Sequence, residues 1–387
     1  MEAPFLAALA GVILLAWLGL ALGHGGFWRG RLPLRSPEPA HWPAVVAVVP
    51  ARDEAEVLGA ALSSLLTQDY PGSWHVIVVD DHSSDGTAAV ARSTALRLGP
   101  DARLTVVPAR PLPAGWAGKV WAQAEGLAVL ARRLPGTDYV LLTDADIVHG
   151  PSALRRLVAR AEAERRVLTS LMVRLRCVSR AEQALVPAFV FFFAMLYPFS
   201  RVNDPGSRTA AAAGGCMLAR VEALSAIGGM AAIRSALIDD CALAAAMKRQ
   251  GAIRLDLADD SLSLRAYGWG EFWNMIARSA FTQLRHSAWL LAATVAGMLL
   301  LYAAPPVLLL MPGTGVLAAV LAGAAWLLMA GIYCPMLRYY GRPLVESLAL
   351  PLVALFYLGA TVASAWRHQH GRGGQWKGRS QTIRETT

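Results

Sequence analysis

Long apolar segments stand at both ends of the chain. Residues 3–22 are twenty uncharged, mostly apolar residues, a length that spans a bilayer core of about 30 Å. Residues 287–337 contain no charged side chain and exceed one crossing, so we expect Pro305-Pro306 with Pro312-Gly313 to break them into two spans. Residues 347–366 form a further apolar segment. The pattern predicts one N-terminal and two to three C-terminal transmembrane helices.

The middle of the chain follows a different pattern, in which short apolar runs alternate with amphipathic stretches. Strands are expected at residues 44–50, 74–81 and 103–107, and in a run that ends at Asp144. Helices are expected from Asp53 to about Gln68, from Gly86 to Leu98, and over 119–134. Strands alternating with helices of this length indicate a three-layer α/β domain with a mostly parallel sheet. Such domains bind ligands beyond the carboxyl ends of their strands.

The fourth of these strands ends in two carboxylates one residue apart, Asp144 and Asp146. In a strand, residues i and i+2 point to the same side, so both carboxylates can face one site. Two such oxygen ligands suit a hard divalent cation, Mg²⁺ or Mn²⁺, that carries a phosphorylated ligand. Taken alone, the Asp-x-Asp pattern is equally consistent with a polar turn that closes a strand.

Other polar side chains follow the neighbouring strands at the same predicted edge of the sheet. The full set is Arg52, Asp53, Asp80, Asp81, Asp144 and Asp146. Because ligands bind at this edge, the coincidence favours a ligand site over a simple turn.

Composition separates this chain from an ordinary soluble protein. It is 55% hydrophobic and 16% charged, where soluble domains carry about 25% charged residues. The net charge of +9 comes largely from Arg-rich patches beside apolar segments, which indicates contact with an anionic lipid bilayer and no nucleic-acid binding. The four cysteines show no paired spacing, so neither a zinc site nor a disulfide framework is indicated.

Basic residues suggest how the chain is oriented in the membrane. Arg29, Arg31 and Arg35 follow the first apolar segment, which predicts a retained anchor at 1–23 and a cytoplasmic domain after a basic, Pro-rich linker at 24–43. Basic residues on both sides of the last apolar segment leave the number of full crossings open. Residues 185–199 are apolar on all sides, which is consistent with a buried helix or with an interfacial segment.

Five motifs, in this order, resemble family 2 glycosyltransferases of the GT-A fold. They are Pro50–Glu54, Val79–Thr87, Thr143–Asp146, Gly214–Arg220 and Ile238–Asp240. With its anchor and C-terminal membrane region, the chain looks most like the hopene-associated glycosyltransferases, a bacterial branch near ceramide glucosyltransferase. The resemblance implies a Rossmann-like nucleotide-sugar domain at 44–286, a membrane region at 287–366 and a basic tail at 367–387. It also implies an inner (cytoplasmic) membrane location.

The resemblance implies a role for each motif in binding a nucleotide-sugar, with a UDP-sugar as the family's usual donor. The residues concerned are Pro50, Arg52, Asp53, Glu54, Asp80, Asp81, Lys119, Asp144, Gly215, Arg220, Asp239 and Arg285. Three of them have simpler alternatives. Asp53 with Glu56 fits a capping box, Lys119 fits a solvated lysine at a helix start, and Arg285 fits a basic anchor before a membrane span.

The reaction itself is assigned to three carboxylates. Asp144 and Asp146 would hold the metal, with Asp146 the favoured direct ligand by resemblance, and the metal would stabilise the charge on the leaving diphosphate. Asp240 would remove the proton of an attacking hydroxyl, and one base without an enzyme nucleophile fits the family's inverting displacement. For Asp240 the alternative is a helix cap.

These observations predict an inverting glycosyltransferase that moves one sugar to a membrane lipid, with a hopanoid link implied by resemblance. Single transfer is favoured because the family's Gln-x-x-Arg-Trp motif, which holds a growing polymer, is degraded here to residues 282–286. Two alternatives remain: a polyprenyl-phosphate glycosyltransferase, and a non-catalytic nucleotide-binding membrane scaffold.

Overall fold

The computed structural model describes residues 2–30, 36–99, 102–370, 375–376 and 379–380. It divides into two compact units. The helical unit comprises Met1–Gly30, Cys177–Ser200 and Ala266–Gly374, and the sheet unit comprises Arg31–Arg176, Arg201–Arg265 and Gln375–Thr387. Residues 177–200 and 266–286, which lie within the expected domain at 44–286, group with the helical unit. Arg31, Arg35 and Lys377 lie outside the described residues.

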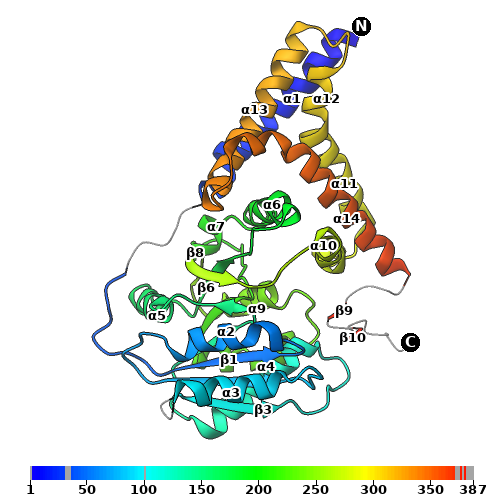
Figure 1. The fold of residues 1–387 in the computed structure, drawn as a ribbon. Coiled ribbons are helices and arrows are strands. Elements are labelled where there is room, and N and C mark those ends of the chain that lie inside the picture. The colour runs from blue at the N-terminus through cyan, green and yellow to red at the C-terminus, as the bar shows by residue number, and fades with distance from the viewer. Residues whose placement is uncertain (1, 31–35, 100–101, 371–374, 377–378, 381–387) are drawn as a thin grey trace. The chain divides into compact units, whose positions relative to one another are not determined.

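The sheet unit is built on an eight-stranded mixed sheet with the order β3-β2-β1-β4-β7-β6-β8-β5. Figure 1 labels β1, β3, β6 and β8 of this sheet. The strands are β1 Val45–Ala51, β2 Trp74–Asp80, β3 Leu104–Pro108, β4 Tyr139–Thr143, β5 Ile147–Val148, β6 Leu168–Arg174, β7 Cys216–Arg220 and β8 Ile253–Ser263. The four strands expected from the sequence are confirmed and run parallel to one another. The expectation of a mostly parallel sheet is confirmed, since β6 and β8 also pair in parallel. The sheet is mixed because β7 is antiparallel to both β4 and β6, and β5 is antiparallel to β8.

Helices cover the sheet, as expected for a three-layer domain. They are α2 Ala55–Leu66, α3 Thr87–Leu98, α4 Gly118–Arg133, α5 Ala153–Ala163, α8 Val221–Ala226 and α9 Asp239–Met247, with the 3-10 turn η2 Gly229–Ile233. The apolar faces of α2 and α5 share one core with β1, β2 and β4. On α4, Gly126 lies against Val48 of β1 and Val79 of β2, side chains that alternate with those facing α2.

The direction of the chain brings the polar motifs to one edge. All seven residues of β1, Val-Val-Ala-Val-Val-Pro-Ala, are buried, as expected for a central parallel strand rich in β-branched residues. Beyond the carboxyl ends of β1, β2 and β4 lie Arg52, Asp81 and Asp144. The helix that connects two parallel strands begins at the carboxyl edge and runs back to the amino edge. The helix α4 therefore begins at the carboxyl edge, with Gly118 and Lys119.

The helical unit contains the long apolar segments. Its elements are α1 Glu2–Gly23, η1 Phe27–Arg29, α6 Arg180–Leu196, α10 Trp269–Gln283, α11 Ala288–Met298, η3 Leu299–Ala303, α12 Ala304–Leu310, α13 Val316–Tyr339, η4 Leu344–Ala349 and α14 Leu350–Gln369; α7 Phe199–Asn203 follows α6. Within the described residues four helices are long and apolar enough to cross a membrane: Pro4–Gly23, Ala288–Leu310, Val316–Tyr339 and Leu344–Gln369. The prediction of one N-terminal and two to three C-terminal apolar helices is confirmed, with three at the C-terminal end.

The break between the two spans lies at Pro312-Gly313, as expected: the chain turns between Met311 and Gly315, where Gly313 and Gly315 have positive φ. The other expected break, at Pro305-Pro306, is wrong, because these prolines lie in the first turn of α12, which continues α11 through the π-helical turn η3. A local π-helical turn can accommodate proline within an apolar helix, because it lets the freed backbone groups find other partners.

The apolar run at 185–199 is largely one helix, α6. Ser179 and Glu182 form a capping box at its start, and Phe191, Leu185 and Val186 are buried within the helical unit. The Tyr357 hydroxyl of α14 donates to the Leu185 carbonyl at 2.8 Å, so α6 packs directly on a long apolar helix. The interfacial placement of this segment stays a prediction.

Candidate active site

The two aspartates of the Asp-x-Asp motif lie in the turn between β4 and β5. The turn is closed by the Ile147 amide, which donates to the Asp144 carbonyl at 3.3 Å. Because the strand ends at Thr143, the side chains do not have the strand alternation that the sequence suggested. They contact different partners: Asp144 faces Lys119, and Asp146 faces the end of β8.

Lys119 is the centre of the acidic cluster. Its Nζ lies 2.8 Å from Oδ1 of Asp144 and 3.4 Å from Oδ2 of Asp239. Burial alone would lower the pKa of Lys119, but the three neighbouring aspartates, 144, 239 and 240, raise it. The side chain is 17% exposed, so the alternative of a solvated lysine at a helix start is wrong. Lys119 is a largely buried, protonated cation that contacts carboxylates of two motifs.

Burial also acts on Asp144. It raises the pKa of this carboxyl, which the Lys119 ammonium lowers and the neighbouring Asp146 and Asp239 raise further; the net pKa is above the usual range. The carboxylates of the two motifs are therefore close enough to repel one another. Such repulsion favours the binding of an additional cation.

Asp240 stands at the start of α9, where the backbone holds both of its oxygens. Oδ2 accepts from the Gly214 amide at 3.0 Å, and Oδ1 accepts from the Cys241 amide at 2.7 Å. Burial and Asp239 raise the pKa of Asp240 to about 6, against the effect of Lys119. The helix-cap alternative does not hold, because Ile238 occupies the N-cap position and no side chain caps the helix.

Gly214 and Gly215 let the chain pass close to these groups. A Cβ on Gly214 would stand 3.0 Å from Nζ of Lys119, tighter than ordinary contact. A Cβ on Gly215 would stand 2.9 Å from Val173, and the Gly215 carbonyl accepts from the Thr143 hydroxyl at 2.7 Å. Gly215 thus contributes to the site through its backbone.

The motifs after β1 and β2 form the second half of the site. Arg52 donates to the Asp81 carbonyl at 2.8 Å and lies 3.6 Å from its carboxylate, and Asp81 is fully buried. Asp53 has φ 50°, and its Oδ1 accepts from the Ser84 amide at 2.8 Å. The Ser83 amide in turn donates to Oδ1 of Asp80 at 3.3 Å. Two of the predicted nucleotide-binding motifs are therefore interlocked.

The alternative in which Asp53 only caps a helix is wrong. Glu54, not Asp53, occupies the N-cap position of α2, and its side chain makes no capping hydrogen bond. The Ala55 amide, in the first turn of α2, donates instead to Oδ2 of Asp85 at 2.9 Å. The N-cap of α3 is Gly86, with φ 88°. The side chain of Asp53 is used between the two loops because β1 and β2 are adjacent.

Arg265 joins the two halves of the site and was not identified from the sequence. Its Nη2 donates to Oε1 of Glu54 at 2.6 Å, and its Nε lies 3.5 Å from Oδ2 of Asp146. The Ser263 hydroxyl donates to the same oxygen at 2.7 Å. The only sequence signal is the position of this arginine, two residues after an alternating strand.

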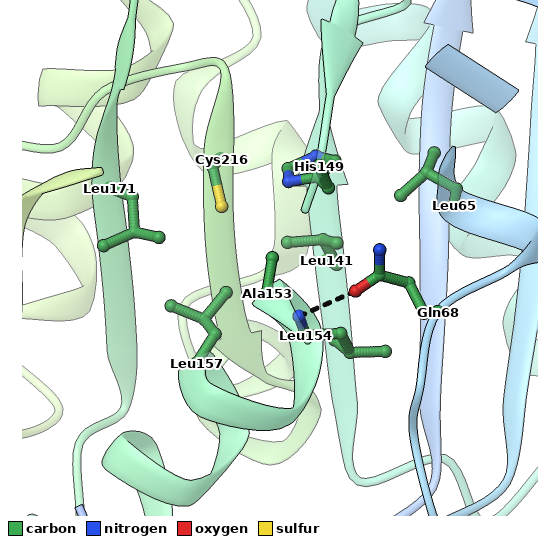
Figure 2. Close-up of a pocket in the computed structure, with 9 residues that line it drawn as sticks. All are labelled: Leu65, Gln68, Leu141, His149, Ala153, Leu154, Leu157, Leu171 and Cys216. Atoms are coloured by element: carbon green, nitrogen blue, oxygen red, sulfur yellow. Dashed lines mark hydrogen bonds between the residues drawn. The ribbon is translucent and has the colours of Figure 1, made fainter. Parts of the chain in front are cut away.

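His149 contacts the strand residue that precedes the Asp-x-Asp turn, and it was also not identified from the sequence. Its Nε2 shares a hydrogen bond with the Thr143 hydroxyl at 3.0 Å, and its Nδ1 shares one with the Ser261 hydroxyl at 3.1 Å. Burial lowers its pKa to about 4, so the ring is neutral. His149 borders a cavity of about 10 Å³ that is lined mainly by apolar side chains. Figure 2 shows the lining residues, among which Gln68 accepts a hydrogen bond from the Leu154 amide. This cavity is too small for a nucleotide.

Three of the predicted site residues show no hydrogen bond or ion pair, within the described residues, to the cluster around Lys119. Pro50 is a buried member of β1, paired with Val79. Arg220 pairs with Tyr139 at the amino end of β4, roughly 16 Å from Asp144 at about 3.3 Å per strand residue, and binds Glu162 at 2.8 Å; it is not part of the cluster. Arg285 belongs to the helical unit and has φ 52°, and its role at the donor stays a prediction.

Comparison with known proteins bears on the fold and the family. A solved mannosyltransferase from Pyrobaculum calidifontis, in complex with GDP-Man and Mn²⁺, is similar over 94% of this chain and 99% of its own, with a TM-score of 0.54 and 21% identity. That likeness supports the GT-A fold.

An N-acetylglucosaminyltransferase of Mesorhizobium japonicum is 31% identical over 127 residues, which cover 33% of this chain. The match spans only 27% of that relative. The model of the family described as glycosyltransferase like family 2 matches residues 43–255, more than half of the chain. The chain therefore belongs to glycosyltransferase family 2.

Proposed function

We propose that this glycosyltransferase is a metal-dependent, inverting enzyme that transfers a single sugar from a nucleotide-sugar to the hydroxyl of a membrane lipid. The observation that carries the proposal is the Lys119 ammonium, which lies between Asp144 of one motif and Asp239 of another. Lys119, the proposed phosphate contact, thus joins Asp144, a proposed metal ligand, to Asp239, which is adjacent to the proposed base Asp240.

The residues at the turn fit a divalent cation bound together with a donor. Among the described residues no group of three or more His, Cys, Asp or Glu side chains is arranged to hold a metal by itself. Mg²⁺ and Mn²⁺ are commonly held by one or two carboxylates plus substrate phosphates, and Asp144 and Asp146 supply that number. The Pyrobaculum calidifontis relative, with GDP-Man and Mn²⁺, supports this assignment. The cation would stabilise charge on the leaving diphosphate.

Asp240 is the proposed general base. A base works best when its pKa lies near the working pH, and burial raises the pKa of Asp240 to about 6. Its two backbone hydrogen bonds fix the carboxylate, so the acceptor hydroxyl would lose its proton to a positioned group. As the proton moves to Asp240, the acceptor oxygen attacks the anomeric carbon and the diphosphate leaves from the opposite face.

The lipid acceptor is proposed from the helical unit. Four helices there are long and apolar enough to cross a membrane, so a glycosyltransferase carrying them has lipids as its nearest acceptors. We propose a hopanoid-related lipid, a UDP-sugar donor and a catalytic unit on the cytoplasmic side of a bacterial inner membrane. Single transfer is supported by the degraded motif at 282–286, in which Thr282 and His286 share a hydrogen bond at 3.2 Å.

A donor and acceptor screen tests this function. Detergent-solubilised protein would be offered radiolabelled UDP- and GDP-sugars with total bacterial lipid, with and without Mn²⁺. We expect one labelled lipid, formed only with the cation and stable to mild acid, as a glycoside is. An acid-labile product would instead identify a polyprenyl phosphate acceptor. If no nucleotide-sugar were hydrolysed or transferred, the scaffold alternative would replace the proposal.

A further inference from the structure

The end of β8 is built against the Asp-x-Asp turn. The Leu264 amide donates to the Asp146 carbonyl at 2.8 Å, and Ser263 pairs with Ile147 across the antiparallel β5–β8 ladder. Side chains alternate along an extended chain, so Ser263 and Arg265 lie on the same side. Both reach Oδ2 of Asp146, and the backbone pairing fixes which residues do so.

Arg265 puts a permanent positive charge on a proposed metal ligand. Its Nε lies 3.5 Å from Oδ2 of Asp146, while its Nη2 is bonded to Glu54 at 2.6 Å. Lys119 occupies the same relation to Asp144. A cation this close weakens the attraction of the carboxylate for a divalent ion, because like charges repel strongly where solvent is partly excluded.

The same guanidinium suits the diphosphate of a donor. Arginine presents a planar fork of donors that matches phosphate oxygens, and the side chain is 37% exposed, so a ligand at this edge can reach it. Glu54 belongs to the motif proposed to line the nucleotide pocket. Arg265 therefore lies between the group proposed to hold the metal and the group proposed to hold the nucleotide.

We propose that Arg265 couples metal binding to donor binding: it opposes a divalent cation at Asp146 until the phosphate oxygens of a donor bind its guanidinium. This inference rests on the proposed function and adds a regulatory role for one residue of that site. Coupling of this kind is reciprocal, so the metal and the donor assist each other. A free cation alone would bind weakly, and the site would be completed only when the nucleotide-sugar arrives.

The test is to measure the two ligands separately. Purified wild type, Arg265→Gln and Arg265→Lys would be titrated with Mn²⁺ alone, followed by electron paramagnetic resonance, and with UDP or GDP in the presence of EDTA, followed by calorimetry. For Arg265→Gln we expect Mn²⁺ to bind about tenfold tighter and the nucleotide about tenfold weaker, since a repelling and an attracting charge are removed together. Arg265→Lys, which keeps the charge, should stay near wild type for Mn²⁺.

Arg156 provides the matched control. Its side chain is 40% exposed and is paired with Asp259 and Asp260 of β8, so Arg156→Gln removes a comparable ion pair outside the site and should change neither affinity. If Arg265→Gln weakened both ligands together, or changed neither while Tm fell, Arg265 would be a structural residue only and the inference would be overturned. If wild-type protein bound neither Mn²⁺ nor nucleotide, the proposed function would fail, and the inference with it.

Discussion

The sheet unit carries two charged clusters at opposite edges, and they are built differently. The cluster at the carboxyl edge contains five carboxylates and two cations: Glu54, Asp144, Asp146, Asp239 and Asp240 with Lys119 and Arg265. The cluster at the amino edge contains four arginines and three carboxylates: Arg160, Arg166, Arg220 and Arg254 with Glu162, Glu164 and Asp256.

The difference is one of charge balance. At the amino edge each carboxylate meets an arginine, and Glu164 meets both Arg166 and Arg254, at 3.0 and 2.8 Å. At the carboxyl edge negative charge is in excess, and the pKa of Asp240 is raised to about 6 by burial and Asp239. Strongly perturbed carboxyl groups gather where chemistry needs them. The comparison teaches that the charges of a structural ion-pair network balance one another within the protein. A catalytic cluster keeps an excess of negative charge that its ligands balance when they bind.

The largest effect is expected from Asp240→Asn. Replacing the proposed base with an isosteric amide should reduce sugar transfer by about 10³-fold, within the usual range for general-base catalysis. Nucleotide binding should change little, because Lys119 and the metal ligands remain. Transfer would be measured in membranes with a radiolabelled donor, and binding by calorimetry. Transfer at the wild-type rate would show that the proton leaves by another route.

A smaller loss is expected from Asp146→Asn. Removing one charge from the proposed metal site should weaken Mn²⁺ binding in the presence of UDP or GDP by about 10- to 100-fold and lower transfer to match. Raising the Mn²⁺ concentration should restore much of the activity. The rescue distinguishes a metal ligand from a residue that holds the turn, since added cation would leave a misfolded turn inactive.

The sequence was sufficient for the parts of this contrast that depend on local pattern. The sequence predicts buried strands such as Val45–Ala51 and the long apolar helices directly, because burial and membrane crossing both require continuous apolar runs. The gathering of Arg52, Asp81 and Asp144 at one edge was accessible through the rule that ligands bind beyond the carboxyl ends of parallel strands. Resemblance supplied Lys119, Asp239 and Asp240.

Side chains whose partners are remote along the chain could not be read in this way. Arg265 reaches Glu54 across 211 positions, and His149 reaches Ser261 across 112, so neither pairing leaves a local pattern. Arg220 shows the converse error. It is the last residue of the motif Gly214–Arg220, whose first residues border the site, but β7 runs antiparallel to β4, so the end of this strand lies at the amino edge of β4. The position of Arg220 depends on the direction of β7, which the periodicity of the sequence does not reveal.

A more modest effect is expected from pH. Asp240 must be a carboxylate to accept a proton, so kcat/KM should be level above its pKa of about 6 and fall as the pH drops below that value, about tenfold per pH unit. The direction follows because protonation removes the base. The profile would be measured under conditions where wild-type protein remains folded. An ordinary carboxyl, titrating near pH 4, would show no fall until two units lower.

The smallest effect on catalysis is expected at the amino edge, from Arg220→Gln. The change removes an ion pair of 2.8 Å with Glu162 and a hydrogen bond of 2.5 Å to the Tyr139 hydroxyl. Because the pair is about one-third exposed, solvent screening limits its contribution to about 1 kcal/mol or less. We therefore expect Tm to fall by a few degrees with kcat and KM within twofold of wild type. A selective loss of nucleotide affinity would return Arg220 to the donor site and end the distinction between the two edges. With Asp240→Asn, which should show the opposite pattern, the variant separates the network that holds the fold from the cluster that performs the reaction.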